Sequence, residues 1–219
     1  MAPRVRAVRR PFADRADAGR ALAAPLAELG LRRPLLVGLA RGGVPVAVAA
    51  AAALGGDAEV GVGVARKITA PERPEAGLGA VASEGEPVWF DLALRHAGLT
   101  PADLADVVDA ERAEAARREH AYGAGTWDRV PGRDVVLVDD GIATGMTVRA
   151  ALGALDAAGP ARVVLAVPVA APSALERLAA DWGGQVVAVV VPPDFRAVGD
   201  SYDDFAQLTD DDVRRVLGR

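Results

Sequence analysis

Short apolar runs alternate along the chain with longer stretches in which apolar residues recur at helical spacing. The apolar runs predict strands at 35–39, 59–65, 134–139, 162–169 and 185–191. The stretches between them predict helices at 13–29, 45–54, 101–121, 144–158 and 172–182. Alternation of this kind is typical of consecutive βαβ units. The pattern therefore predicts an α/β fold with a doubly wound, mainly parallel sheet of five strands.

Some stretches depart from this pattern. Residues 67–86 have weak periodicity and contain several Pro and Gly residues, which predicts a long loop or an irregular hairpin; a loop of that length is usually functional or disordered. A short strand is expected at 88–92. Residues 192–219 are acidic and end in a predicted helix at 210–217. We therefore expect a core of residues 1–191 and a C-terminal segment of residues 192–219.

Composition narrows the classes of protein that fit this fold. Aromatic residues make up 4% of the chain, so the core must be built mainly from Ala, Val and Leu. Such residues suit parallel strands that are buried under helices on both faces. The chain has no cysteine, which excludes disulfides, thiolate metal sites and thiol nucleophiles.

The balance of charge and hydropathy bears on partners and location. The net charge of −5 argues against a surface that coats nucleic acid, although Arg4, Arg6, Arg9 and Arg10 form a basic run near the N-terminus. No apolar stretch reaches the ~20 residues that a membrane-spanning helix needs, and no apolar signal core precedes a cleavage site. We therefore expect a cytoplasmic protein that has no membrane partner.

Lysine is used once in this chain. Of the 25 basic residues, only Lys67 is lysine and the rest are arginine. In a chain with this bias, the lone lysine marks a position where a compact ammonium group on a flexible stem matters, or else a surface position where it survives by chance. The composition alone leaves both interpretations open.

Residues 134–147 combine the features of a ligand site. A buried strand runs into Asp139 and Asp140, at the strand edge where open α/β sheets bind ligands. The loop that follows is small, contains two threonines and opens a helix, so its N–H groups and the helix dipole can hold an anion. An anion-binding loop next to two carboxylates fits a single ligand that carries both a phosphate and a vicinal diol. The loop would bind the phosphate, and the carboxylates would accept hydrogen bonds from the hydroxyls. The pattern therefore indicates a sugar phosphate.

This segment resembles the 5-phosphoribosyl-1-pyrophosphate (PRPP) signature of the type I phosphoribosyltransferases, in which two acids precede a Thr-Gly-x-Thr loop. The resemblance implies that the acids bind the ribose hydroxyls and that the loop cradles the 5′-phosphate. The PRPP-binding residues expected here are Asp139, Asp140, Gly141, Ile142, Ala143, Thr144, Gly145, Met146 and Thr147. The main rival is a receiver domain, whose strand also ends in paired acids, but its lysine lies downstream of them and Lys67 lies upstream.

Further segments extend the resemblance over most of the chain. Arg41, Gly42 and Gly43 match the family's pyrophosphate loop, in which a strained backbone presents N–H groups and glycine permits close approach. Arg66 and Lys67 match the family's flexible catalytic loop, which closes over pyrophosphate and excludes water. The resemblance thus implies catalytic roles for Arg41 and for one of the two loop cations, with Lys67 favoured and Arg66 able to serve instead.

The acceptor is less well defined by the resemblance. Ala143 stands where the hypoxanthine-guanine branch has an Asp that works on the purine, although the adenine branch has Ala there. Phe195 and Asp203 resemble the base-side segment of the hypoxanthine branch, which implies that Phe195 covers the acceptor and that Asp203 approaches a second Mg²⁺. It is equally plausible that Phe195 only anchors the C-terminal segment on the sheet. The uncharacterised bacterial group that the chain resembles most has no assigned acceptor.

Taken as a whole, the resemblance implies Mg²⁺-dependent transfer of a phosphoribosyl group from PRPP to a small nitrogenous acceptor, for example a nucleobase, with release of pyrophosphate. The C-terminal segment would form a hood over the site, and we expect a homodimer. A non-catalytic regulator that senses PRPP is the first alternative. A phosphatase or phosphorylase that acts on ribose phosphates in the same pocket is the second.

Overall fold

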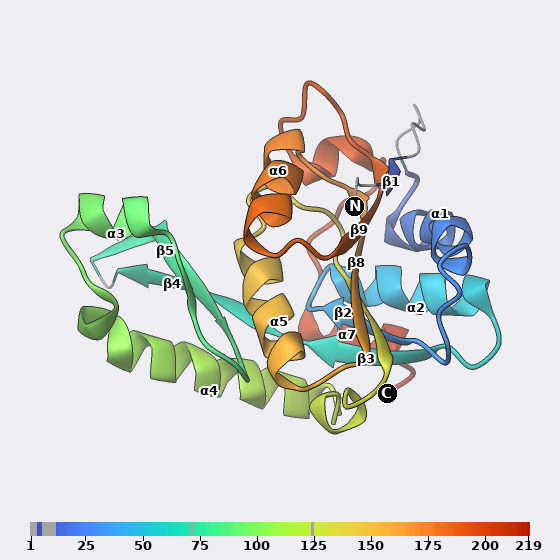
Figure 1. Cartoon of the computed structure of the whole chain (residues 1–219), viewed down its shortest axis with the longest axis horizontal. Helices are drawn as coiled ribbons and strands as arrows, with labels where there is room; N and C mark the ends of the chain where they lie inside the picture. The colour runs from blue at the N-terminus through green and yellow to red at the C-terminus, as the bar shows by residue number, and fades with distance from the viewer. Residues whose placement is uncertain (1–3, 6–11, 71, 124) are drawn as a thin grey trace.

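A six-stranded parallel sheet forms the body of the computed structural model, which describes residues 4–5, 12–70, 72–123 and 125–219 (Figure 1). The strand order is β1, β9, β8, β7, β2, β3. The five predicted strands are present as β2 (Leu35–Leu39), β3 (Glu59–Gly63), β7 (Asp134–Val138), β8 (Arg162–Val169) and β9 (Gln185–Val190). The pattern does not predict β1 (Arg4–Val5), a two-residue edge strand paired with β9. Arg6, Arg9 and Arg10 of the basic run lie outside the described residues.

The strand order reverses between β2 and β7. β3 pairs with one side of β2, whereas β7 pairs with its other side and leads on to β8 and β9. The doubly wound, mainly parallel topology is thereby confirmed. Connections leave the carboxyl ends of β2 and β7 towards opposite faces of the sheet, which makes this switch point the usual place for a ligand.

Helices cover both faces of the sheet, which Figure 1 shows nearly edge-on. One face carries α1 (Arg15–Ala27) and α2 (Gly43–Leu54), and the other carries α5 (Met146–Ala157) and α6 (Pro172–Asp181). Side chains alternate along β2, so Leu35 and Val37 pack against α5 and α6 while Leu36 packs against α1 and α2. Burial of each such side chain contributes roughly 1.5–3 kcal/mol. No helix in the described part of the chain is long and apolar enough to cross a membrane.

A smaller lobe projects from one end of the sheet (Figure 1). Its elements are β4 (Ala65–Ala70), β5 (Arg73–Ala82), β6 (Val88–Trp89), α3 (Asp91–Ala97), a 3-10 turn (Pro101–Leu104) and α4 (Ala105–Ala121). β4 and β5 pair antiparallel with register shifts near the tip, so residues 67–86 form the irregular hairpin rather than a long loop. The strand expected at 88–92 ends at Trp89, because Asp91 begins a helix whose first turn favours an acid.

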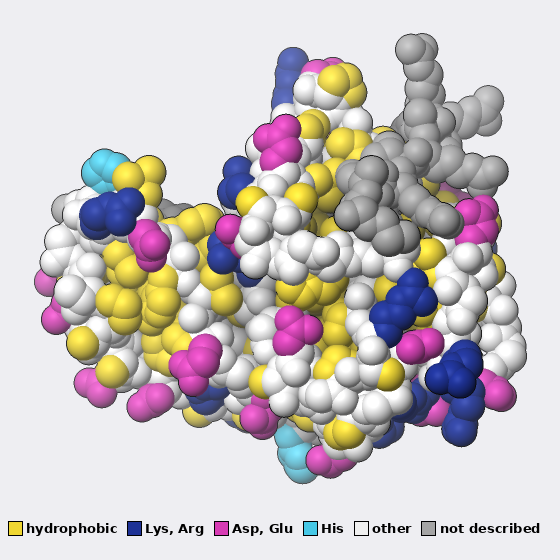
Figure 2. All heavy atoms as spheres, viewed as in Figure 1, with side chains coloured by type: hydrophobic (Ala, Val, Ile, Leu, Met, Phe, Trp, Pro, Cys, Tyr) yellow, Lys and Arg dark blue, Asp and Glu magenta, His cyan; other side chains and the backbone are white. Residues whose placement is uncertain are grey.

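The hairpin lobe has hydrophobic packing of its own. One cluster joins the hairpin to α3 and α4 and contains Ile68, Ala70, Leu78, Val81, Leu94, Leu104 and Val108. A second cluster, Ala80 with Met146 and Ala150, packs the hairpin against α5. Figure 2 shows that hydrophobic side chains also gather on the visible surface of this lobe. The hairpin is therefore supported by helices on two sides.

The C-terminal segment returns across the start of α1. It contains a 3-10 turn (Val198–Ser201) and α7 (Asp210–Val216). The Phe12 N–H donates to the Ser201 carbonyl at 2.6 Å, and the Asp203 N–H donates to the Phe12 carbonyl at 2.7 Å. The ring of Tyr202 lies between those of Phe12 and Phe205, with centroid distances of 5.5 and 4.8 Å. These contacts hold the segment against Phe12, just before the start of α1.

Candidate functional site

The loops that follow β2 and β7 meet at the switch point. Gly42 and Gly43 belong to the first loop, and Asp139 and Asp140 begin the second. A Cβ atom on Gly42 would lie 1.9 Å from a carboxylate oxygen of Asp140, and one on Gly43 would lie 2.3 Å from the Val138 carbonyl oxygen. The Gly43 contact is with backbone, so the approach of the two loops requires glycine there, whereas a side chain at Gly42 would displace the Asp140 carboxylate. The fold thus joins the predicted pyrophosphate loop to the predicted acid pair.

The acid pair is held by three hydrogen bonds. Arg15 of α1 donates from Nε to Oδ2 of Asp140 at 2.8 Å, and these two side chains are only 12% and 16% exposed. The Asp140 N–H donates to Oδ1 of Asp139 at 2.9 Å, and the Tyr202 hydroxyl donates to the Asp140 carbonyl at 2.5 Å. One oxygen of Asp140 is therefore committed to a cation from α1, while its backbone is held by the C-terminal segment.

Burial governs the protonation of these acids. Desolvation raises the pKa of Asp139 well above its usual value, and the neighbouring Asp140 charge raises it further. Desolvation also raises the pKa of Asp140, although Arg15 opposes this effect by favouring the carboxylate. Hydroxyl donors or a cation at this position would stabilise the ionised pair. The pair is therefore well suited to a ligand that supplies such groups.

The turn after the acid pair leads into α5. Ile142 is buried, and its N–H donates to the Val169 carbonyl at 2.9 Å, which ties the turn to β8. Gly145 has φ 79°, a left-handed conformation that favours glycine, and it immediately precedes the helix. Ala143 and Thr144 between them are exposed. The expected phosphate loop is thus a short turn, anchored at its start, that opens the N-terminus of α5.

A cavity of about 370 Å³ joins this turn to the hairpin. Its lining residues are Lys67, Gly77, Gly79, Ala80, Phe90, Thr144, Met146 and Thr147. Both signature threonines therefore share one cavity with the only lysine of the chain. Arg66 points to the other side of β4, where its Nε donates to Glu111 of α4 at 2.7 Å. Side chains alternate along a strand, so only one of the two adjacent cations can face this cavity.

Arg41 lies beside α7. Its Nη1 is 3.7 Å from Oδ1 of Asp210, the same oxygen that accepts a hydrogen bond from the Tyr122 hydroxyl at 2.7 Å. The peptide bond between Ala40 and Arg41 is cis. The Arg41 side chain is about one-third exposed, and a long ion pair between groups this exposed is weak.

The two residues expected in the C-terminal segment differ in their surroundings. Phe195 is half-buried and packs against hydrophobic residues from both faces of the sheet. Asp203 is exposed, and its N–H is bonded to Phe12. Among the described residues, no group of three or more His, Asp or Glu side chains is arranged to hold a metal. Asp139 and Asp140 nevertheless offer carboxylate oxygens, and Mg²⁺ is commonly bound by one or two carboxylates together with substrate phosphates.

Two contributors to the site are not identified by sequence reasoning. Arg15 and Tyr202 lie 125 and 62 positions from Asp140, in a helix and in a segment whose patterns carry no motif. Arg15 also donates to the Ala206 carbonyl at 2.9 Å, and its guanidinium carbon stacks 4.0 Å from the centre of the Phe205 ring. The only signal for Arg15 in the sequence is its place at the start of the first predicted helix.

Comparisons with known proteins agree with this geometry. The model of the phosphoribosyl transferase domain family matches residues 13–195. Two Mycobacterium tuberculosis proteins, from strains H37Rv and CDC 1551 and each named "Putative phosphoribosyl transferase", are 41% identical over 210 residues, which is 95% of this chain and 46% of theirs. The chain therefore spans about half the length of these curated relatives.

A solved structure is similar over nearly its whole length. The crystal structure of TT1426 from Thermus thermophilus has a TM-score of 0.76 and 45% sequence identity, and the match covers 94% of this chain and 97% of that one. The family match extends over more than half of the sequence and includes both loops of the switch point. This chain belongs to the phosphoribosyltransferase family.

Proposed function

We propose that this protein catalyses Mg²⁺-dependent transfer of the phosphoribosyl group from PRPP to a small nitrogenous acceptor and releases pyrophosphate. The observation that carries the proposal is the junction at the switch point, where Gly42 lies against the Asp140 carboxylate and the Gly43 backbone approaches the Val138 carbonyl too closely for a side chain. Pyrophosphate and ribose are neighbours in PRPP, and the loop that we propose for pyrophosphate lies directly beside the carboxylates that we propose for ribose.

Each part of PRPP has a group suited to it. The backbone N–H groups from Ala143 to Thr147, with the positive end of the α5 dipole, would hold the 5′-phosphate. Asp139 and Asp140 would accept hydrogen bonds from the ribose hydroxyls. The loop at Arg41 to Gly43 would bind the diphosphate. Mg²⁺ would be held by this diphosphate and the acid pair, where it would neutralise negative charge on the leaving group.

We propose Lys67, which lines the cavity, as the cation that acts late in the reaction. Displacement at the anomeric carbon passes through an oxocarbenium-like state, and negative charge grows on the departing pyrophosphate. An ammonium group on the hairpin side of the cavity can stabilise that charge while the hairpin and α5 restrict access of water. Arg66 is engaged with Glu111, which favours Lys67 as the loop cation.

The C-terminal segment would complete the site on the acceptor side. We propose residues 1–191 as the catalytic core and residues 192–219 as a hood, with Phe195 covering the acceptor ring and Asp203 beside a second Mg²⁺. The connection of this segment to Asp140 through Tyr202 and Arg15 supports the hood. A homodimer and a cytoplasmic location stay predictions from the sequence.

A screen of acceptors tests the reaction. Nucleobases and related nitrogen heterocycles would be incubated singly with PRPP, Mg²⁺ and the protein, and pyrophosphate release would be measured with an enzyme-coupled assay. At least one acceptor should give release that depends on both PRPP and Mg²⁺ and is lost in Asp139→Asn/Asp140→Asn. PRPP binding by calorimetry without release for any acceptor would contradict catalysis and favour the regulator. Absence of PRPP binding would contradict both.

A further inference from the structure

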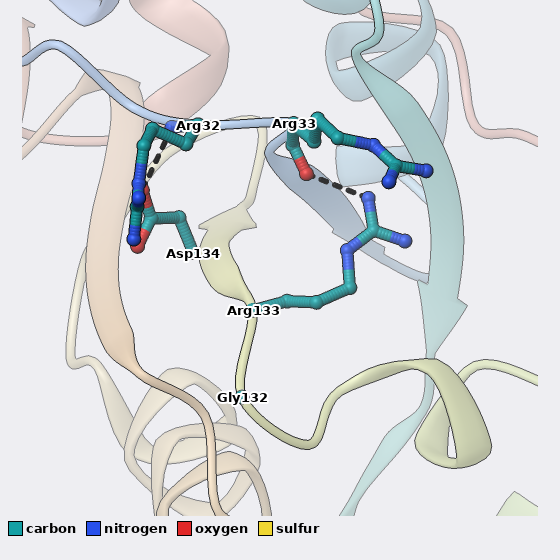
Figure 3. Close-up of a pocket in the computed structure, with 5 residues that line it drawn as sticks. All are labelled: Arg32, Arg33, Gly132, Arg133 and Asp134. Carbon is teal, nitrogen blue, oxygen red and sulfur yellow. Dashed lines mark hydrogen bonds between the residues drawn. The ribbon is translucent and has the colours of Figure 1, made fainter.

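A second cavity lies at the opposite edge of the sheet from the candidate active site. It measures about 380 Å³ and is lined by Arg32, Arg33, Gly132, Arg133 and Asp134 (Figure 3). These residues precede or begin β2 and β7, so the cavity sits at the amino ends of the two strands whose carboxyl ends carry the switch point. Five-residue strands separate the two regions by about 17 Å.

Arg133 is fixed in place within this cavity. Its Nη2 donates to the Arg33 carbonyl at 2.6 Å, and its Nη1 donates to Glu59 of β3 at 3.0 Å. Glu59 also lies 3.4 Å from Arg129, and the Arg133 hydrogen bond lowers the pKa of Glu59, so this acid stays ionised and holds both guanidinium groups. Arg133 is therefore ordered before any ligand arrives, and the entropy cost of binding through it is reduced.

Arg32 and Arg33 leave their guanidinium groups available. Both side chains are exposed, and neither makes a hydrogen bond or an ion pair with any residue that the structure describes. The Arg32 backbone N–H donates to Oδ2 of Asp134 at 2.8 Å, which occupies one oxygen of the only acid in the lining. In Figure 3 the side chains of Arg33 and Arg133 extend on one side of the cavity, and that of Arg32 lies along Asp134 on the other.

The charge at this edge is opposite in sign to that of the whole chain. Among the charged residues named at this edge, Arg32, Arg33, Arg129 and Arg133 outnumber Glu59 and Asp134 by two, in a chain of net charge −5. By contrast, the arginines of α4 and α7 are largely matched with acids one turn away. Arg33 also has φ 45°, a left-handed backbone that is uncommon for arginine and directs its carbonyl to Arg133.

From these observations we propose that the cavity is a second anion site, which binds a di- or triphosphate group. Guanidinium groups form paired hydrogen bonds with phosphate oxygens, and three of them distributed around one cavity suit a chain of phosphates better than a single one. The volume exceeds that of a phosphate chain alone and can hold part of a nucleotide. This site is separate from the proposed PRPP site and does not depend on it.

Calorimetry with tripolyphosphate, in low salt and without divalent cations, tests the site. The wild-type protein is compared with Arg32→Gln/Arg33→Gln, and with a control, Arg95→Gln/Arg177→Gln, which removes the same charge from exposed residues of α3 and α6. We expect at least tenfold weaker binding for the first variant and unchanged binding for the control, with melting temperatures equal to wild type. An equal loss in both variants, or none in either, would overturn the proposal.

Hydrogen–deuterium exchange distinguishes the two anion sites. Tripolyphosphate should protect peptides that cover residues 31–35 and 130–135, whereas the proposed PRPP site would show protection at residues 139–147. Protection confined to residues 139–147 would overturn the second site without affecting the proposed function.

Inorganic phosphate should bind at least tenfold more weakly than tripolyphosphate, and equal affinity would contradict the ligand class. Tighter binding of ADP than of tripolyphosphate would place the nucleoside in the cavity, and equal binding would assign the site to the phosphate chain; both support the proposal.

Discussion

The switch point and the hairpin lobe face each other across the candidate site but are stabilised differently. Gly42, Asp139 and Asp140 are attached to β2 and β7, whose apolar side chains are buried between two helical layers. Lys67 instead lies on a hairpin with a small hydrophobic cluster of its own. Groups that bind a substrate before reaction gain from a rigid support, whereas a group that acts on developing charge can lie on an element that moves. Under the proposed function, the sheet edge would bind PRPP and the lobe would assist its cleavage.

The largest expected effect follows from neutralising the acid pair. Asp139→Asn/Asp140→Asn should weaken PRPP binding by about 1.5–3 kcal/mol for each charge-assisted hydrogen bond that is lost. Because burial raises the pKa of both acids, wild-type affinity should also fall as the pH drops through that raised range, where the carboxylates take up protons. Calorimetric titration over a pH series measures both effects, and unchanged affinity in the variant would remove the role of the pair.

Truncation of Phe195, which packs on the sheet rather than on the lobe, distinguishes a role in acceptor binding from a role in packing. If Phe195 stacks on the acceptor, Phe195→Ala should raise the KM for the acceptor by the equivalent of about 1–3 kcal/mol and leave PRPP affinity unchanged. Its half-buried ring packs against both core clusters, so a purely structural role predicts a loss of up to ~3–5 kcal/mol of stability. Chemical denaturation and acceptor kinetics together distinguish the two roles. A large loss of stability without a change in the KM for the acceptor would exclude the stacking role.

Substitution of Lys67 tests the function of the lobe. Lys67→Ala should lower kcat by the equivalent of about 1.5–3 kcal/mol while PRPP affinity changes little, because the ammonium group acts on charge that appears only in the transition state. Lys67→Arg serves as the control that keeps the charge. Arg66→Ala should instead release Glu111 and affect mainly the packing of α4. Equal kcat for wild type and Lys67→Ala would exclude this residue as the loop cation.

The smallest expected effect concerns the junction of lobe and sheet. Glu119 of α4 is buried and accepts hydrogen bonds from the Val64 N–H at 2.8 Å, the Ser83 hydroxyl at 2.6 Å and Trp127 Nε1 at 2.8 Å. Val64 directly precedes β4 and Ser83 directly follows β5, so these hydrogen bonds hold the base of the hairpin. Glu119→Gln turns one acceptor into a donor, so stability should fall by ~1–3 kcal/mol.

The pH dependence of stability provides a second readout for Glu119. Burial raises its pKa above the unfolded value of 4.5, so the folded state holds the proton more tightly than the unfolded state. Its contribution to stability is therefore complete below pH 4.5 and is lost as the pH rises through the folded pKa. Urea unfolding over this range should show that slope in wild type and in the partly exposed control Glu114→Gln. A slope that persists in Glu119→Gln would assign it to other groups.

Most elements of this fold follow from the sequence because their signals are local. Alternation of apolar runs and helical stretches predicts the five longer strands of the parallel sheet, and Thr100, which directly precedes the helix predicted at 101–121, caps its first turn. The irregular hairpin is predicted only as one of two alternatives, since its Pro and Gly residues fit a loop equally well. The two-residue strand β1 is too short to leave a pattern, and its pairing with β9 depends on contacts distant in the sequence.

The order of residues by itself determined the strand, the acid pair and the small hydroxyl-rich turn of residues 134–147, because these lie within one continuous segment whose chemistry can be read residue by residue. Only the tertiary structure decided which distant groups complete it. The parallel sheet brings Gly42 against Asp140, α1 supplies Arg15 as its counterion, and strand alternation directs Lys67 rather than Arg66 to the cavity. Such choices depend on packing between elements that are far apart in the chain, and no local pattern encodes them.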